Sequence, residues 1–208
     1  MQHLYDPAYQ NQSLALRTTA ALDKLADVFK TLLWESQKEH QLSPLQQKLL
    51  IFVASHKPEE NTVSNLVQEF NLTKATVSDC ISTLVSKKWL NKQLNHKDNR
   101  RFYIELTAQG GEKLKGLTDF SEPLQKAIAQ DSEENLKELY KSLYNLLGRL
   151  NQPQLATLNR SCLDCQAYRS DPLNYAFCMQ LRIQLPPENR RLDCPEYISK
   201  KDKSLSIK

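Results

Sequence analysis

The stretch "LTKATVSDCISTLVSKKWL", residues 72–90, decides the fold of this 208-residue chain. Thr73 is suited to cap the free amides at the start of a helix, which then runs to about residue 88. At about 100° per residue the apolar positions of that helix share one side, which we predict to be buried: Val77, Ile81 and Leu84. Cys80 falls on the same side, so we interpret it as a small core residue rather than a ligand.

The opposite side of this helix carries short polar side chains, as a helix that reads base edges in the DNA major groove requires. The residues that we expect to contact DNA there are Lys74, Ala75, Thr76, Ser78, Asp79 and Ser82. Asp79 could accept a hydrogen bond from a cytosine amine, or its charge could simply lower nonspecific affinity.

A shorter helix comes directly before this one. Apolar spacing predicts it from Asn61 or Thr62 to Phe70, and only a short turn separates the two, as in a helix-turn-helix. Upstream, "SPLQ" at residues 43–46 predicts another helix start. Ser43 can cap the amides, Pro44 suits the first helical position, and Gln46 can reach back to the cap.

Residues 90–107 predict a β-hairpin after the helix-turn-helix, which makes the unit a winged helix. Its second half, "RFYIELT", is rich in aromatic and branched residues that favour strands, and its polar centre suits a hairpin tip. The tip residues that we expect to meet phosphates or the minor groove are Lys97, Asp98, Arg100 and Arg101, with the carboxylate orienting one arginine. The alternative is an exposed turn whose charges are merely solvated, and we interpret His96 in that way.

Positive charge is concentrated in the same region. Between Lys74 and Arg101 there are seven basic and two acidic residues, a net charge of +5, whereas the whole chain carries +4. A basic segment on a near-neutral body is the charge distribution of a nucleic-acid contact, although a solvated lysine-rich face has the same composition.

Long helices flank the winged helix in the sequence. Only four glycines occur in the chain, and apolar spacing predicts helices over 13–39, over 108–130 with an interruption near Pro123, and over 131–152. The first and last carry apolar stripes, which could pack within the chain or against a second copy. The predicted fold class is therefore mainly α with a small β-hairpin wing.

These segments, together with "LSPLQQKLLIFVA" at 42–54 and "KDNRRFYIELTAQG" at 97–110, resemble the MarR-type winged-helix regulators over about residues 13–152. In that family the wing carries Asp-x-Arg, five residues, Leu-Thr and soon a glycine, which here are Asp98, Arg100, Leu106, Thr107 and Gly110. Two positions depart from the pattern. Trp89 stands where a turn glycine is usual, and Asp79 where a basic residue is frequent.

The resemblance implies a homodimer in which N- and C-terminal helices intertwine and two winged helices bind a pseudopalindromic operator in double-stranded DNA. It implies a transcriptional regulator and not an enzyme, and the sequence has no Gly-rich phosphate loop, HExxH or Ser-His-Asp arrangement. A small ligand between the dimer helices, common in that family, is not visible in the sequence. The expected domains are 1–40 (dimerisation helix), 41–112 (winged helix), 113–152 (dimerisation helices), 153–198 (cysteine-containing segment) and 199–208 (disordered tail).

Four of the five cysteines lie after residue 160 with the spacing C-x2-C-x12-C-x15-C: Cys162, Cys165, Cys178 and Cys194. We expect a cytoplasmic protein with no membrane contact, because the N-terminus lacks a signal-peptide pattern and no apolar run approaches about 20 residues. In that reducing compartment such a cluster favours metal or redox chemistry over a disulfide framework. Asp171 and Pro172 have the pattern of a helix start, which predicts a helix carrying Cys178 as far as Pro186.

Four interpretations of these thiols are open: unrelated cysteines, a disulfide redox sensor, a structural zinc site and a [4Fe-4S] cluster. Zinc fits four ligands but usually takes two CxxC pairs, and here there is one. A cluster tolerates scattered ligands, and Pro195 follows the last cysteine as in bacterial ferredoxins. We therefore favour a [4Fe-4S] cluster over zinc, and expect it to make DNA binding responsive to oxygen, nitric oxide or redox state.

Two other functions remain open at the level of the sequence. One is an iron-sulfur redox or DNA-repair enzyme that docks through its winged helix, and the other is a zinc-stabilised DNA-binding adaptor. The absence of catalytic motifs argues against the enzyme. A regulator would protect discrete palindromes on DNA, which separates it from a nonspecific adaptor.

Overall fold

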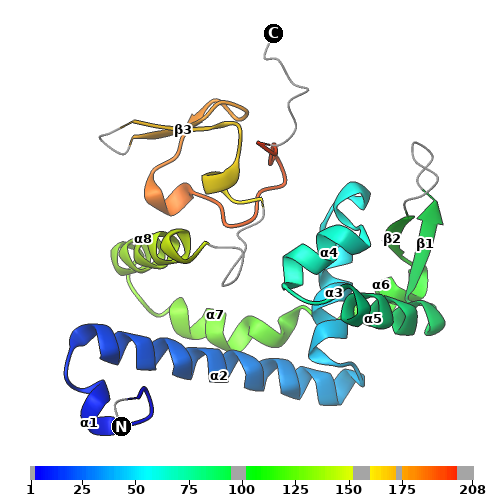
Figure 1. Cartoon of the computed structure of the whole chain (residues 1–208), viewed down its shortest axis with the longest axis horizontal. Coiled ribbons are helices and arrows are strands. Elements are labelled where there is room, and N and C mark those ends of the chain that lie inside the picture. The colour runs from blue at the N-terminus through cyan, green and yellow to red at the C-terminus, as the bar shows by residue number, and fades with distance from the viewer. Residues whose placement is uncertain (1–2, 95–101, 152–159, 172–174, 201–208) are drawn as a thin grey trace.

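The computed structural model describes residues 3–94, 102–151, 160–171 and 175–200 (Figure 1). The expected mainly helical class is confirmed. The helices are α1 (Pro7–Gln10), α2 (Leu14–His40), α3 (Pro44–Ser55), η1 (Pro58–Glu60), α4 (Val63–Phe70), α5 (Lys74–Ser86), α6 (Ala108–Leu114), η2 (Asp119–Ser121), α7 (Glu122–Ile128), α8 (Glu133–Leu150), η3 (Cys162–Asp164) and η4 (Pro187–Asn189). The strands are β1 (Leu90–Leu94), β2 (Phe102–Leu106), β3 (Tyr168–Ser170), β4 (Ala176–Cys178) and β5 (Ile183–Gln184).

The predicted winged helix is present from α3 to α6. Ser43 and Gln46 form the capping box at the start of α3, and Thr73 caps α5 through the amide of Thr76. Between α4 and α5 the chain turns at Asn71, whose φ of 50° is left-handed. The strands β1 and β2 pair antiparallel, with Leu90 opposite Leu106.

One apolar core joins these elements. The predicted inner side of α5 is buried completely, and it packs against α3, α4 and the hairpin. The fully buried members of this core include Leu49, Leu50, Leu66, Val77, Ile81, Leu84 and Ile104. Cys80 lies in this core, as expected, and is 7% exposed.

The junction of α5, β1 and α6 leaves no room for side chains at one point. Shortly after α5 the backbone turns at Lys88, which has a left-handed φ of 61° and directly precedes Trp89. A Cβ atom added to Gly110 would lie 2.1 Å from the carbonyl oxygen of Trp89. Thr107 caps α6 through the amide of Gly110 and donates to the carbonyl of Lys88.

In Figure 1, α2 and α7 lie lower than the winged helix, with α7 above α2, and α8 lies to the left of the winged helix. Phe29 of α2 contacts Phe120 of η2 edge to face, with ring centroids 5.6 Å apart. The predicted interruption near Pro123 falls slightly earlier, at residues 115–121, and Pro123 lies in the first turn of α7, where proline needs no amide partner. Within the described ranges no helix is both long and apolar enough to cross a membrane.

The cysteine module, by which we mean the described residues between 160 and 200, is a small β-structure. Its three strands pair antiparallel in the order β3-β4-β5. The predicted helix through Cys178 is wrong, because Cys178 lies on β4. Asp171 does not cap a helix; its backbone amide donates to the carbonyl of Tyr175 and its side chain accepts from the amide of Tyr175, which closes the turn between β3 and β4.

Candidate nucleic-acid interface and cysteine module

The polar face of α5 is open to solvent. Ser78 is half-buried, and the other predicted contact residues of this helix are exposed: Lys74, Ala75, Thr76, Asp79 and Ser82. The opposite side of α5 is buried in the winged-helix core, so this face is the one that the helix can offer to a groove. Burial raises the pKa of the Cys80 thiol to about 11, which suits its interpretation as a core residue.

The hairpin is positioned as a wing, but its tip lies outside the described residues. The register runs from Leu90–Leu106 to Leu94–Phe102, so the connecting residues 95–101 begin where the pairing ends. Those residues include the predicted contacts Lys97, Asp98, Arg100 and Arg101, whose roles stay predictions.

All four C-terminal cysteines are buried, and three of them (Cys162, Cys165 and Cys178) belong to one small apolar cluster. Their exposed fractions lie between 6% and 9%, and each of the four is a free thiol: Cys162, Cys165, Cys178 and Cys194. They come from four places in the chain. Cys162 begins η3, Cys165 ends it, Cys178 lies on β4, and Cys194 follows η4.

Three of the four sulfur atoms accept hydrogen bonds from nitrogen. The Arg191 amide lies 3.2 Å from Sγ of Cys162, the Leu181 amide 3.4 Å from Sγ of Cys178, and the Arg191 guanidinium 3.4 Å from Sγ of Cys194. Donors of this kind stabilise negatively charged sulfur, and they are a usual part of the surroundings of thiolate ligands.

The pKa of Cys162 is raised above its ordinary value. Burial is the largest cause, the negative charges of Cys194, Cys165 and Cys178 add to it, and the hydrogen bond from the Arg191 amide opposes it. Without a bound cation the neutral thiol is therefore the favoured form, and a metal centre would instead stabilise the thiolate.

The donor set fits a thiolate-bound metal centre in its chemistry. In the described ranges, however, no three His, Cys, Asp or Glu side chains are placed closely enough to form a metal-binding group. The metal therefore stays a proposal that rests on the convergence, burial and hydrogen bonding of the sulfurs.

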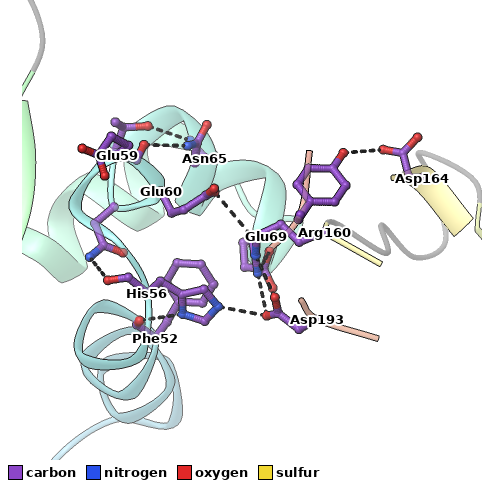
Figure 2. A network of polar contacts seen from close by, with 12 residues as sticks. Phe52, His56, Glu59, Glu60, Asn65, Glu69, Arg160, Asp164 and Asp193 are labelled. Carbon is purple, nitrogen blue, oxygen red and sulfur yellow. Dashed lines mark hydrogen bonds and ion pairs between the residues drawn. The ribbon is translucent and has the colours of Figure 1, made fainter. Parts of the chain in front are cut away.

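A network around Arg160 joins the cysteine module to the winged helix (Figure 2). The Arg160 side chain is 8% exposed and forms a bidentate pair with Asp193, at 2.9 and 2.8 Å. It also pairs with Glu69 of α4 at 3.2 Å and with Glu60 of η1 at 3.8 Å. The guanidinium lies 5.0 Å from the ring centroid of Phe52 in α3.

His56, directly after α3, completes this network. Its ring stacks on Phe52 at 3.7 Å, with Nδ1 2.8 Å from the Phe52 carbonyl and Nε2 2.9 Å from the Asp193 carboxylate. Both oxygens are acceptors, so the ring fills both contacts only when each nitrogen carries a proton. Burial opposes the ionisation of Asp193, but hydrogen bonds from Arg160 and His56 outweigh it and lower the pKa of Asp193.

The sequence prediction missed this network. It assigned no role to Arg160, Asp193 or His56. The available signal was the placement of charged residues beside cysteines, since Arg160 precedes Cys162 by two positions and Asp193 directly precedes Cys194. That signal gives no hint of the partners on α3 and α4.

The fold and the exposed polar face of α5 define a winged helix-turn-helix protein. Residues 31–117 match the protein family described as transcriptional regulator SarA/Rot. A search of curated proteins finds no match.

Solved structures of MepR from Staphylococcus aureus have the same fold. MepR in its DNA-binding conformation aligns with a TM-score of 0.58 and 22% identity, covering 64% of this chain and 98% of MepR. The MepR–DNA complex aligns with a TM-score of 0.56 and 22% identity, covering 64% and 97%. These matches support a winged-helix transcription regulator, and the SarA/Rot match ends well before the cysteine module.

Proposed function

We propose that this protein is a transcriptional regulator of MarR type that binds double-stranded operator DNA through α5 and the wing. The observation that carries the proposal is the exposed polar face of α5, set on a buried apolar side within a winged helix. The family match to transcriptional regulators and the likeness to a protein solved in complex with DNA support it. A regulator of this kind with reduced cysteines would work in the cytoplasm.

We infer that the DNA-binding form is a homodimer. Large apolar side chains are exposed on the flanking helices: Leu25, Val28, Phe29 and Trp34 of α2, Ile128 of α7, and Leu139 and Leu150 of α8. Exposed apolar surface of this extent favours association, and two winged helices would match the two half-sites of a palindrome. Sedimentation of the purified chain tests the dimer.

The experiment that tests the DNA-binding function is footprinting on genomic fragments at physiological salt. A regulator protects discrete paired half-sites about one helical turn apart, whereas a nonspecific adaptor protects DNA without preference. Replacing Ser82 with Ala should weaken operator binding about fivefold or more. Ser170→Ala changes an exposed serine on β3 and serves as the matched control.

We further propose that the four clustered cysteines bind one metal centre, with a [4Fe-4S] cluster favoured over zinc. What supports this is the composition of the module core, in which three of the six buried residues of the cluster are cysteines, and Cys194 is buried as well. About 40 residues with so little apolar core usually need a metal or disulfides to fold. A metal would join the four chain segments, and an iron-sulfur cluster would add a redox-active group.

Metal analysis of protein purified without oxygen or chelator decides between the two. Iron and sulfide with broad visible absorption would identify a cluster, and one zinc per chain with no colour would identify a structural zinc site. An iron-sulfur redox or repair enzyme, the rival function, would turn over a DNA or redox substrate without recognising a discrete operator.

A further inference from the structure

The cysteine module contacts two separate parts of the molecule. On one side it meets the winged helix through the Arg160 network, defined by Arg160, Asp193, His56, Glu60 and Glu69 (Figure 2). On the other side it packs on α8, where η4 lies against the helix (Figure 1).

The α8 contact is close and partly apolar. The Tyr140 hydroxyl donates to the backbone carbonyl of Arg190, and Tyr144 is 2% exposed. A Cβ atom added to Gly148 would lie 3.0 Å from the side chain of Leu163, so the module approaches this helix closely. The module is therefore seated on α8 by packing.

The contact with the winged helix is of a different kind, because a pocket of about 530 Å³ lies at this joint. Its wall includes His56 and Lys57 from the winged helix, and Asp193, Cys194 and Pro195 from the module. The Lys57 ammonium donates to the carbonyl of Pro195 at 2.9 Å. Since the joint is incompletely filled, it depends on its polar contacts more than on packed apolar surface.

The Arg160 network is continuous with the cysteines. The Arg160 carbonyl accepts a hydrogen bond from the Cys194 amide at 3.1 Å, and Asp193 is covalently next to Cys194. Arg160 also holds a left-handed φ of 61°, which non-glycine residues adopt rarely and keep only where surrounding contacts fix it. A change in the backbone conformation at Cys194 would therefore displace both Arg160 and Asp193, the ion pair that faces Glu69 of α4.

We propose that the Arg160 network is the element through which the cysteine module fixes the position of α3 and α4 relative to α8. This inference rests on the proposed function, in which the module folds around a metal and the winged helix binds DNA. With the module folded, Arg160 and Asp193 are held together and engage Glu69 of α4 and His56 at the end of α3. When the module loses its structure, the buried guanidinium loses its fixed partners and the winged helix is released from α8.

The test is a double-mutant cycle read by hydrogen exchange of the α4 amides, residues 63–70, in the full-length protein. Cys194→Ser disrupts the module, and Arg160→Met removes the centre of the network. We expect each change alone to speed α4 exchange about tenfold. Cys194→Ser should add less than about twofold in the Arg160→Met background, because both act through one connection.

The matched control is Arg182→Met. Arg182 lies in the same module with the same left-handed backbone, at φ 56°, but its side chain is exposed. Arg182→Met should leave the hydrogen exchange of the α4 amides unchanged. In its background, Cys194→Ser should speed that exchange as much as it does in the wild type. Glu69→Gln is the milder second variant, since it removes one contact from α4 and leaves the Arg160–Asp193 pair intact.

Two outcomes would overturn the network's role: α4 exchange within twofold of wild type in both Arg160→Met and Glu69→Gln, or an equal response to Cys194→Ser with and without Arg160. Failure of the proposed function has other signs. Wild-type protein that holds no metal, or that protects no operator, would refute the metal or the DNA proposal. The effects of Arg160→Met and Glu69→Gln on α4 would still decide whether the network holds the two parts together.

Discussion

The cores of the winged helix and of the cysteine module differ in amino-acid composition. The core cluster of the winged helix holds thirteen buried residues, all of them apolar apart from Cys80, and most of them are large aliphatic side chains. The cluster in the module holds six, and three of these are cysteines. Large apolar side chains stabilise a fold simply by leaving water, whereas thiols contribute little until they are bonded.

This difference indicates that the two regions depend on different conditions. The winged helix should fold wherever water drives its apolar residues together. The module should fold only where its thiols have a ligand, so its folding should follow metal supply or redox state. Four experiments test this contrast.

The largest effect is expected from Cys162→Ser combined with Cys165→Ser. We predict complete loss of bound metal and of module structure, because metal binding and folding are one equilibrium in such small units. The winged helix should stay folded. Metal analysis and two-dimensional NMR check both points. Cys80→Ala is the control and should keep all the metal; unchanged metal in the double variant would contradict the proposed site.

The converse change is Leu84→Ala in the winged-helix core. Leu84 is completely buried, so the free energy of unfolding should fall by about 3 kcal/mol, with metal content unchanged. Urea unfolding measures the change. Leu94→Ala, at a site 41% exposed on β1, should cost less than about 0.5 kcal/mol. Equal costs at the two sites would mean that burial does not govern this region.

A smaller effect is expected at the junction before α6. Gly110→Ala places a methyl group against the Trp89 carbonyl, so the backbone must shift at a cost of roughly 1–3 kcal/mol in unfolding free energy. Gly111→Ala is the matched control, because its Cβ would meet only a Leu106 methyl group at 3.9 Å. Similar thermal midpoints for the two variants would argue against a close junction.

The smallest effect concerns the pH dependence that Cys80 contributes. Its pKa is raised by burial from 9.0 to about 11, so folded Cys80 stays neutral while the unfolded chain ionises. The stability from this group is therefore present below pH 9 and is lost as pH rises toward 11. Cys80→Ala should flatten the decline in thermal midpoint over that range. At pH 8 Cys80 should also resist alkylation that modifies the metal-free module cysteines; equally rapid labelling would contradict its burial.

Much of the fold could be predicted because its signals are local. Capping residues such as Ser43 and Thr73 fix helix starts, and the apolar side of α5 follows from spacing within one helix. The helix predicted after Asp171 failed for a local reason as well. The Asp-Pro pair suits a helix start and a turn alike. In the described residues Asp171 bonds to Tyr175 and Tyr168 pairs with Cys178, so Cys178 belongs to a strand and not to a helix.

The winged helix and the inner and outer sides of α5 follow from the amino-acid sequence alone. Periodicity and spacing are local properties of the sequence, so they can be read without knowing which distant residues are in contact. Only the tertiary structure decided how the cysteine module meets the winged helix. His56 and Asp193 are 137 residues apart, and nothing in the identity of a histidine or an aspartate specifies a partner at that distance. Their contact arises because the module and the winged helix meet at this place, where the Arg160 side chain, 8% exposed, takes acidic partners from both parts, since an unpaired buried charge would be costly.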